Sequence, residues 1–148
     1  MLKMSVSKLG LSVLLILLGA PLLLVSSCRD QAGTGSEKQV IEDLTLEEAF
    51  VLMEDSRYDD NFIIIDVRTP EEYAGGHVEK AINLDYYSET FADELDKLDK
   101  DNIYLIYCQT NRRSGLALDI MAELGFREVY NMLGGMEEWE AVKLPTVK

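Results

Sequence analysis

Cys108 is the residue whose type and position best suit chemistry in this chain. It follows the apolar run Ile103–Tyr107 and precedes a polar segment that contains Arg112 and Arg113. Such a run is typical of a buried strand in a parallel sheet, and ligands of these sheets bind beyond the carboxyl ends of the strands. Because positive neighbours and helix N-termini stabilise a thiolate, the spacing predicts a reactive thiol. The alternative is a buried structural cysteine.

Composition narrows the classes of protein. The chain has 148 residues, enough for one ordinary domain, and its formal charge of −13 argues against a nucleic-acid partner. Its two cysteines form no CxxC pair, and its single histidine, His77, has no cysteine nearby. These features indicate neither a zinc site nor any other cofactor.

The N-terminus has the pattern of a targeting segment. Lys3 and Lys8 precede an apolar stretch over residues 9–25, which is followed by Ser26, Ser27 and Cys28. This order resembles a bacterial lipobox, so we expect residues 1–27 to be a lipoprotein signal peptide and Cys28 to be lipidated. An ordinary cleaved signal peptide and an uncleaved membrane anchor are the alternatives. All three place the domain outside the cytoplasm, and the first and third attach it to a membrane.

The rest of the chain divides into a tether and one domain. Residues 28–38 are mostly small and polar, which predicts a flexible tether. Residues 39–148 alternate short apolar runs with helical patterns, which predicts an α/β domain with a parallel sheet of about five strands and helices on both faces. The expected strands are residues 40–41, 62–65, 81–84, 103–107 and 129–132.

Several helices have sequence signals of their own. Capping boxes are expected at Thr45 and Thr69, and Gly125 is expected to end the helix that follows Cys108. Leu116, Ile120 and Leu124 should form the buried stripe of that helix.

Four groups of residues, in order, resemble the rhodanese-like domain family over about residues 39–146. They are Asp66-Val67-Arg68 with Glu71-Glu72-Tyr73, then Gly76-His77-Val78 with Ala81-Ile82-Asn83, then residues 108–114, then Gly134-Gly135-Met136 with Trp139 and Leu144-Pro145. The resemblance implies a single-domain sulfurtransferase. In that chemistry the cysteine thiolate takes a sulfane sulfur from a small anion such as thiosulfate and passes it to cyanide or a thiol.

The resemblance also implies the site. Cys108 would be the catalytic nucleophile, and the substrate-binding residues would be Arg68, Gln109, Thr110, Asn111, Arg112 and Arg113. Arginine suits a sulfur oxyanion because its planar fork presents several donors. The loop has the short C-x4-R form, which the resemblance associates with sulfur transfer; the phosphatases and arsenate reductases of this fold use C-x5-R.

Two positions depart from the family pattern. Asn111 stands where glycine is frequent, and Gln109 stands where arginine is frequent. Asparagine tolerates a left-handed backbone, so the turn can still form. Because of these two changes, the sequence does not identify the natural sulfur donor.

Other polar residues have two interpretations each. Arg68 could face the site or pair with Glu71 or Glu72, and Asp66 could anchor an arginine or cap a turn. His77 is expected to be structural. For the whole protein, a tethered module that presents a persulfide or a surface without turnover is the alternative to an enzyme, and a phosphatase or arsenate reductase is the third possibility.

Overall fold

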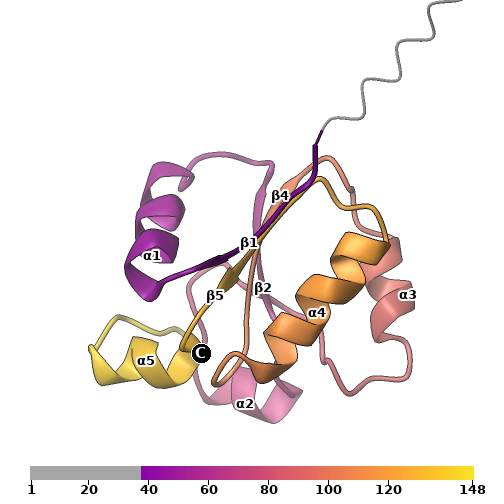
Figure 1. Ribbon diagram of the computed structural model, residues 1–148. Coiled ribbons are helices and arrows are strands. Elements are labelled where there is room, and N and C mark those ends of the chain that lie inside the picture. Colours follow the sequence, from indigo (N-terminus) through magenta and orange to yellow (C-terminus); the bar gives the residue numbers. More distant parts are fainter. Residues whose placement is uncertain (1–37) are drawn as a thin grey trace, which may run out of the picture. The chain divides into compact units, whose positions relative to one another are not determined.

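The computed structural model describes residues 38–148 (Figure 1). The predicted signal peptide and Cys28 lie outside the described residues, as does the tether apart from Lys38. The strands are β1 (Val40–Leu44), β2 (Phe62–Asp66), β3 (Ile82–Asn83), β4 (Ile103–Tyr107) and β5 (Glu128–Met132). The helices are α1 (Leu46–Asp55), α2 (Pro70–Gly75), α3 (Phe91–Asp96), α4 (Arg112–Glu123) and α5 (Gly135–Ala141).

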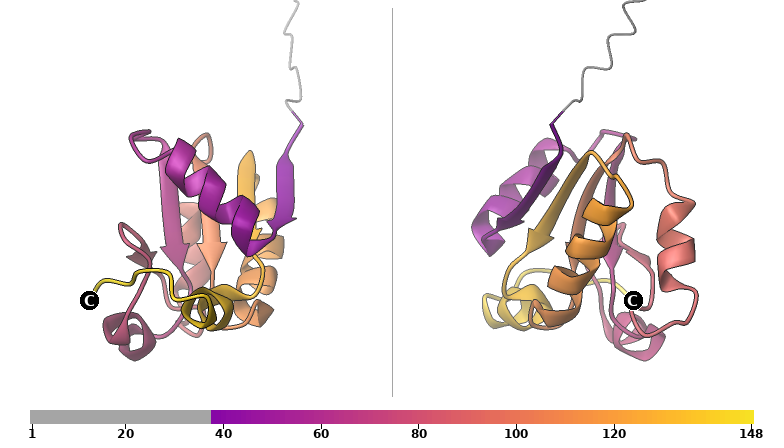
Figure 2. Two further views of the ribbon diagram at one scale, coloured as in Figure 1. Left: turned by 90° about the vertical axis from the view of Figure 1, so that its left-hand side faces the viewer. Right: turned by 45° about the vertical axis from the view of Figure 1, so that its right-hand side comes forward.

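The five strands form one parallel sheet in the order β1-β5-β4-β2-β3, which confirms the predicted fold class. Strand β4 is central, so its side chains are covered on both faces, and residues 104–107 are buried. Their alternation divides the core. Tyr104 and Ile106 pack with residues of α3 and α4, whereas Leu105 and Tyr107 pack with residues of α1 and α5. Figure 2 shows these helices on the two sides of the sheet.

Both predicted capping boxes are present. The Thr45 and Thr69 side chains each accept a hydrogen bond from the backbone of the residue three positions later, Glu48 and Glu72, whose carboxylates accept from the two threonine N–H groups. Gly125 follows α4 with φ of +85°, the left-handed conformation that commonly ends a helix. Local sequence therefore sets where these helices begin and where α4 ends.

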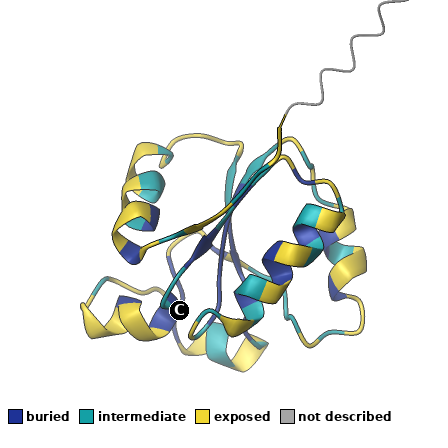
Figure 3. Cartoon of the chain, viewed as in Figure 1, coloured by how far each residue is buried: buried dark blue, intermediate teal, exposed yellow. Residues whose placement is uncertain are grey.

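Three expectations about the elements need correction. Strand β1 is longer than residues 40–41, because it pairs along its whole length with β5. Strand β3 is only two residues long. The stripe predicted for α4 is wrong at Leu116, which is 42% exposed, because Ser114, Ala117, Leu118 and Met121 form the buried face. Figure 3 shows exposed and intermediate residues alternating with buried ones along α4.

The parallel direction brings the C-terminal ends of all five strands to one edge. At this edge lie the segment after β2, the loop between β4 and α4, and the turn between β5 and α5 (Figure 1). Within residues 38–148, no helix is both long enough and apolar enough to cross a bilayer.

Candidate active site

The Cys108 sulfur lies at the centre of a loop that closes around it. The residue is 1% exposed and directly follows β4. Its Sγ accepts a hydrogen bond from the backbone N–H of Asn111 at 3.1 Å and one from the hydroxyl of Ser114 at 3.4 Å. Burial disfavours the thiolate. The hydrogen bonds from the Ser114 hydroxyl and from the backbone of Ser114, Thr110 and Asn111 outweigh it, so the pKa of the Cys108 thiol lies below its ordinary value.

Helix α5 holds the loop from the other side. The backbone N–H groups of Met136 and Glu137 donate to the carbonyl oxygens of Cys108 and Gln109 at 2.9 and 3.0 Å. A Cβ atom at Gly135 would lie 2.4 Å from the Cys108 oxygen, so only glycine permits this approach. Because α5 satisfies the loop carbonyls, the loop N–H groups are left to face the sulfur.

Asn111 takes the left-handed conformation that the turn requires, with φ of +108°. This confirms that asparagine can replace glycine there. Its side chain turns away from the sulfur: its Oδ1 accepts a hydrogen bond from Nδ2 of Asn131 on β5 at 2.6 Å. The same Nδ2 group donates to Asp43 on β1, also at 2.6 Å. Asn131 is fully buried and its Oδ1 has no hydrogen-bond partner among the described residues.

Arg113 forms a two-pronged ion pair with Glu72 of helix α2. The Nη1 and Nη2 atoms each lie 2.7 Å from a carboxylate oxygen of Glu72. These hydrogen bonds hold the pKa of Glu72 at about 2, so the pair is charged at neutral pH. The Tyr87 ring, which is 61% exposed, lies 5.5 Å from the guanidinium carbon.

Arg68 is buried and pairs with Asp66, so of its two interpretations the ion pair with Glu71 or Glu72 does not form. Its Nε and Nη2 atoms donate to the two Asp66 oxygens, and Nη2 also donates to the Gly76 carbonyl at 2.6 Å. Nη1 reaches the Gln109 side chain at 3.3 Å. Arg68 therefore borders the loop, but most of its donors are engaged by the protein.

The other predicted binding residues differ in exposure. Gln109 is half-buried and contacts Arg68, whereas Thr110 and Arg112 are exposed. Among residues 38–148, none forms a hydrogen bond or ion pair with the Arg112 guanidinium. His77 is nearly buried: its ring stacks on Tyr73 and its Nδ1 lies 3.0 Å from the Tyr73 carbonyl, which suits a structural role.

Sequence reasoning gave no site role to Ser114, Glu72 or Asn131. Ser114 could have been found from helical spacing, because the third residue of α4 points back toward its N-terminus. The sequence indicates Glu72 as a capping residue and as a candidate partner of Arg68, but not as a partner of Arg113. Nothing in the local sequence connects Asn131 with a loop twenty residues earlier.

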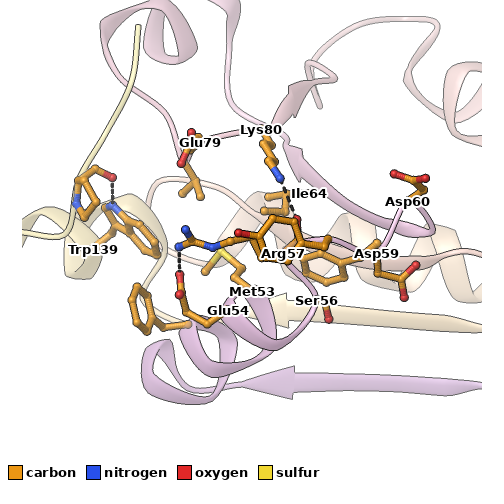
Figure 4. A pocket seen from close by; sticks show the side chains of 15 residues that line it. Met53, Glu54, Ser56, Arg57, Asp59, Asp60, Ile64, Glu79, Lys80 and Trp139 are labelled. Atoms are coloured by element: carbon orange, nitrogen blue, oxygen red, sulfur yellow. Dashed lines mark hydrogen bonds and ion pairs between the residues drawn. The ribbon is translucent and has the colours of Figure 1, made fainter.

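A pocket of about 490 Å³ lies away from this loop (Figure 4). Its walls come from the end of α1, the segment before β2, residues 78–80 and Trp139, whose indole N–H donates to the Pro145 carbonyl at 3.0 Å. Arg57 pairs with Glu54 at its rim, and Lys80 donates to the Arg57 carbonyl. None of the described residues that line it belongs to the loop of residues 108–114. Among residues 38–148, no three His, Cys, Asp or Glu side chains are grouped to hold a metal.

Comparison with known proteins agrees with the family resemblance seen in the sequence. A family model described as Rhodanese-like domain matches residues 45–142. The thiosulfate sulfurtransferase PspE of Escherichia coli is 38% identical over 86 residues, which are 57% of this chain and 77% of PspE. The putative sulfur carrier protein YrkF of Bacillus subtilis is 38% identical over 93 residues, 62% of this chain and 48% of YrkF.

Other curated relatives match only in part. The uncharacterized protein slr1261 of Synechocystis is 35% identical over 92 residues, 62% of this chain and 50% of that protein. The chain thus spans about half the length of some of the relatives that it matches.

Solved structures agree on the fold. A rhodanese-related protein from Thermoplasma volcanium aligns with a TM-score of 0.60 at 21% identity, over 72% of this chain and 97% of that one. A rhodanese-like domain protein from Staphylococcus aureus aligns with a TM-score of 0.55 at 28% identity, over 66% and 90% of the two chains.

Proposed function

This chain belongs to the rhodanese-like domain family, and on that premise we propose that it is a sulfurtransferase that carries a sulfane sulfur on Cys108. The observation that carries the proposal is the position of the Cys108 sulfur, which accepts hydrogen bonds from Asn111 and Ser114 at the N-terminus of α4. This arrangement favours the thiolate, which is the nucleophilic form of cysteine.

The reaction has two steps. In the first, the Cys108 thiolate attacks the outer sulfur of a donor such as thiosulfate, the donor S–S bond breaks, and sulfite leaves with the electron pair. Cys108 is then a persulfide, and its terminal sulfur carries the negative charge that the loop N–H groups stabilise. In the second step a nucleophile such as cyanide or a thiolate attacks the terminal sulfur and restores the Cys108 thiolate.

The number of residues between Cys108 and Arg113 supports sulfur rather than phosphate chemistry. A four-residue spacing leaves a small ring of N–H donors, and the Asn111 N–H group already lies 3.1 Å from the sulfur. A tetrahedral phosphate needs room for several oxygen atoms within the ring. Phosphatase or arsenate reductase activity is therefore the weaker proposal for this loop.

The test is sulfur loading of purified protein, read by intact-mass spectrometry after incubation with a sulfane donor. A gain of one sulfur atom on the wild type, which cyanide reverses with release of thiocyanate, is expected. Cys108→Ser should gain none, whereas Cys28→Ala should load like the wild type. Loading and turnover that persist in Cys108→Ser would refute the proposal.

A sulfur carrier without turnover is the second candidate. One relative in the comparisons bears the name of a putative sulfur carrier protein, and Cys108 is the single free cysteine among the described residues. With no second thiol near it there, a persulfide on Cys108 has to be discharged to another molecule. Stable loading with no release to cyanide or small thiols, but release to a protein thiol, would favour this candidate.

We further propose that the domain is held outside the cytoplasm by a lipid on Cys28. The support is the sequence alone: two lysines, an apolar stretch over residues 9–25, and two serines before Cys28. Acyl chains gain about 0.8 kcal/mol per buried methylene, so two or more anchor a protein stably. Cys28→Ala should abolish acylation and release the protein from membranes; a variant that still floats with membranes would exclude the lipid as the anchor.

A further inference from the structure

Two arginines of the site, Arg113 within the loop of residues 108–114 and Arg68 beside Gln109, are already paired with carboxylates. Arg113 makes a two-pronged ion pair with Glu72, and Arg68 makes one with Asp66. A two-pronged pair uses the donor fork that would otherwise clasp an oxyanion. A doubly negative donor such as thiosulfate therefore meets two guanidiniums whose charges are already paired.

The third arginine of the loop region, Arg112, does little to neutralise the charge of such a donor. Arg112 is exposed on the first turn of α4, and an exposed charge is screened by solvent and salt. The whole chain is also strongly acidic, with a formal charge of −13, which disfavours the approach of a dianion. What the loop does offer is a set of neutral N–H and O–H donors around the sulfur.

From these contacts we infer that Glu72 sets the donor preference of the site, by holding Arg113 away from the substrate, and that the preferred donors are organic persulfides rather than thiosulfate. This inference rests on the sulfurtransferase function proposed above. The reacting group of a hydropersulfide, RS–SH, carries at most one negative charge and has no sulfonate oxygens to neutralise. The Cys108 thiolate attacks its outer sulfur, the S–S bond breaks, and the departing RS⁻ takes the proton of the SH group as RSH.

The effect of Glu72 on donor preference can be separated from its role in capping helix α2. The Glu72 carboxylate also accepts the backbone N–H of Thr69, as part of the capping box of α2. Glutamine serves equally well in a capping box, so Glu72→Gln keeps the helix start. It removes the charge and one of the two acceptors that face Arg113, which frees the guanidinium.

Once released from Glu72, the Arg113 guanidinium can act on a donor that approaches Cys108. Its pKa is raised above the ordinary value first by the hydrogen bonds with Glu72 and, with a smaller effect, by the charge of Cys108. The guanidinium is thus within electrostatic reach of the sulfur that a donor must approach. Glu72 acts through Arg113 and is a positioning residue, not a catalytic one.

The experiment measures the first half-reaction alone. Full-length wild type, Glu72→Gln and the matched control Glu71→Gln are mixed with thiosulfate or with glutathione persulfide, and sulfur loading of Cys108 is followed by rapid quench and intact mass. Glu71 is exposed, and among the described residues it is Glu72, not Glu71, that pairs with Arg113. The control therefore removes the same charge from the same helix.

The wild type should load faster from glutathione persulfide than from thiosulfate at equal concentration. Glu72→Gln should lower the thiosulfate concentration for half-maximal loading by about tenfold, the effect of one additional charge-assisted hydrogen bond. Its maximal rate with thiosulfate and its loading from glutathione persulfide should change less than about twofold. Glu71→Gln should behave like the wild type.

Three results would overturn the inference. They are a wild type that prefers thiosulfate, a Glu72→Gln variant that slows both donors alike, and a Glu71→Gln variant that matches Glu72→Gln. In each of these cases Cys108 is still loaded, so the proposed function stands. No loading of Cys108 by either donor would refute the proposed function itself.

Discussion

The hydroxyl of Ser114 should be the main side-chain determinant of Cys108 reactivity. It donates to the Cys108 sulfur at 3.4 Å, and both residues are almost completely buried, at 0% and 1% exposure. A hydrogen bond to a charged group contributes about 1.5–3 kcal/mol, and the long sulfur–oxygen distance argues for the low end. At about 1.4 kcal/mol per pKa unit, Ser114→Ala should raise the Cys108 pKa by about one unit.

The assay is the rate of alkylation by iodoacetamide as a function of pH, in a Cys28→Ala background that leaves Cys108 as the only thiol. Below the pKa, a rise of one unit lowers the thiolate fraction, and with it the alkylation rate, about tenfold. Cys108→Ser in the same background gives the baseline. An unchanged pH profile in Ser114→Ala would show that the backbone N–H groups alone stabilise the thiolate, which would refute this reasoning.

The same hydrogen bond should appear in the pH dependence of stability. Because the pKa of Cys108 is lower in the folded state than in the unfolded state, the free energy of unfolding should rise with pH between the folded value and about 8.5. This contribution is lost as the pH falls through the folded pKa. Ser114→Ala should make the rise smaller, which urea unfolding at a series of pH values would measure.

Three further predictions concern the supports of the site. Gly135→Ala should destabilise the fold by more than about 2 kcal/mol in urea unfolding, because its Cβ meets loop backbone at 2.4 Å. The control Gly115→Ala, whose Cβ meets nothing within 4 Å, should instead stabilise α4 by about 0.5–1 kcal/mol. Asn131→Ala should cost about 1–2 kcal/mol in the same measurement, since it leaves two hydrogen-bond acceptors unbridged; no loss would show that water replaces the amide. Because the Glu72 pKa is held at about 2 against 4.5, its ion pair with Arg113 should add stability above pH 4.5 that is lost as the pH falls toward 2. Glu72→Gln should reduce this loss of unfolding free energy between pH 4.5 and 2. An unchanged loss would show that the ion pair of Glu72 with Arg113 is not its cause.

Much of the fold follows from local patterns. The run Ile103–Tyr107 is apolar throughout because both faces of β4 are covered, and the capping boxes at Thr45 and Thr69 satisfy N–H groups that every helix start leaves free. These signals act over two to five residues, which is why they can be read without neighbours. The stripe predicted for α4 failed at Leu116, because the angle at which a helix meets a sheet depends on its tertiary partners.

The sequence by itself determined that a cysteine at a strand end begins a short loop with arginine in sixth place, and that asparagine occupies its left-handed position. Only the tertiary structure decided what the arginines do. Asp66, Glu72 and Gly135 are separated from the loop by more than twenty residues, and the parallel sheet brings all three to the edge where β4 ends. A guanidinium binds whichever anion lies nearest in space, so its role depends on the fold and not on its neighbours in the chain.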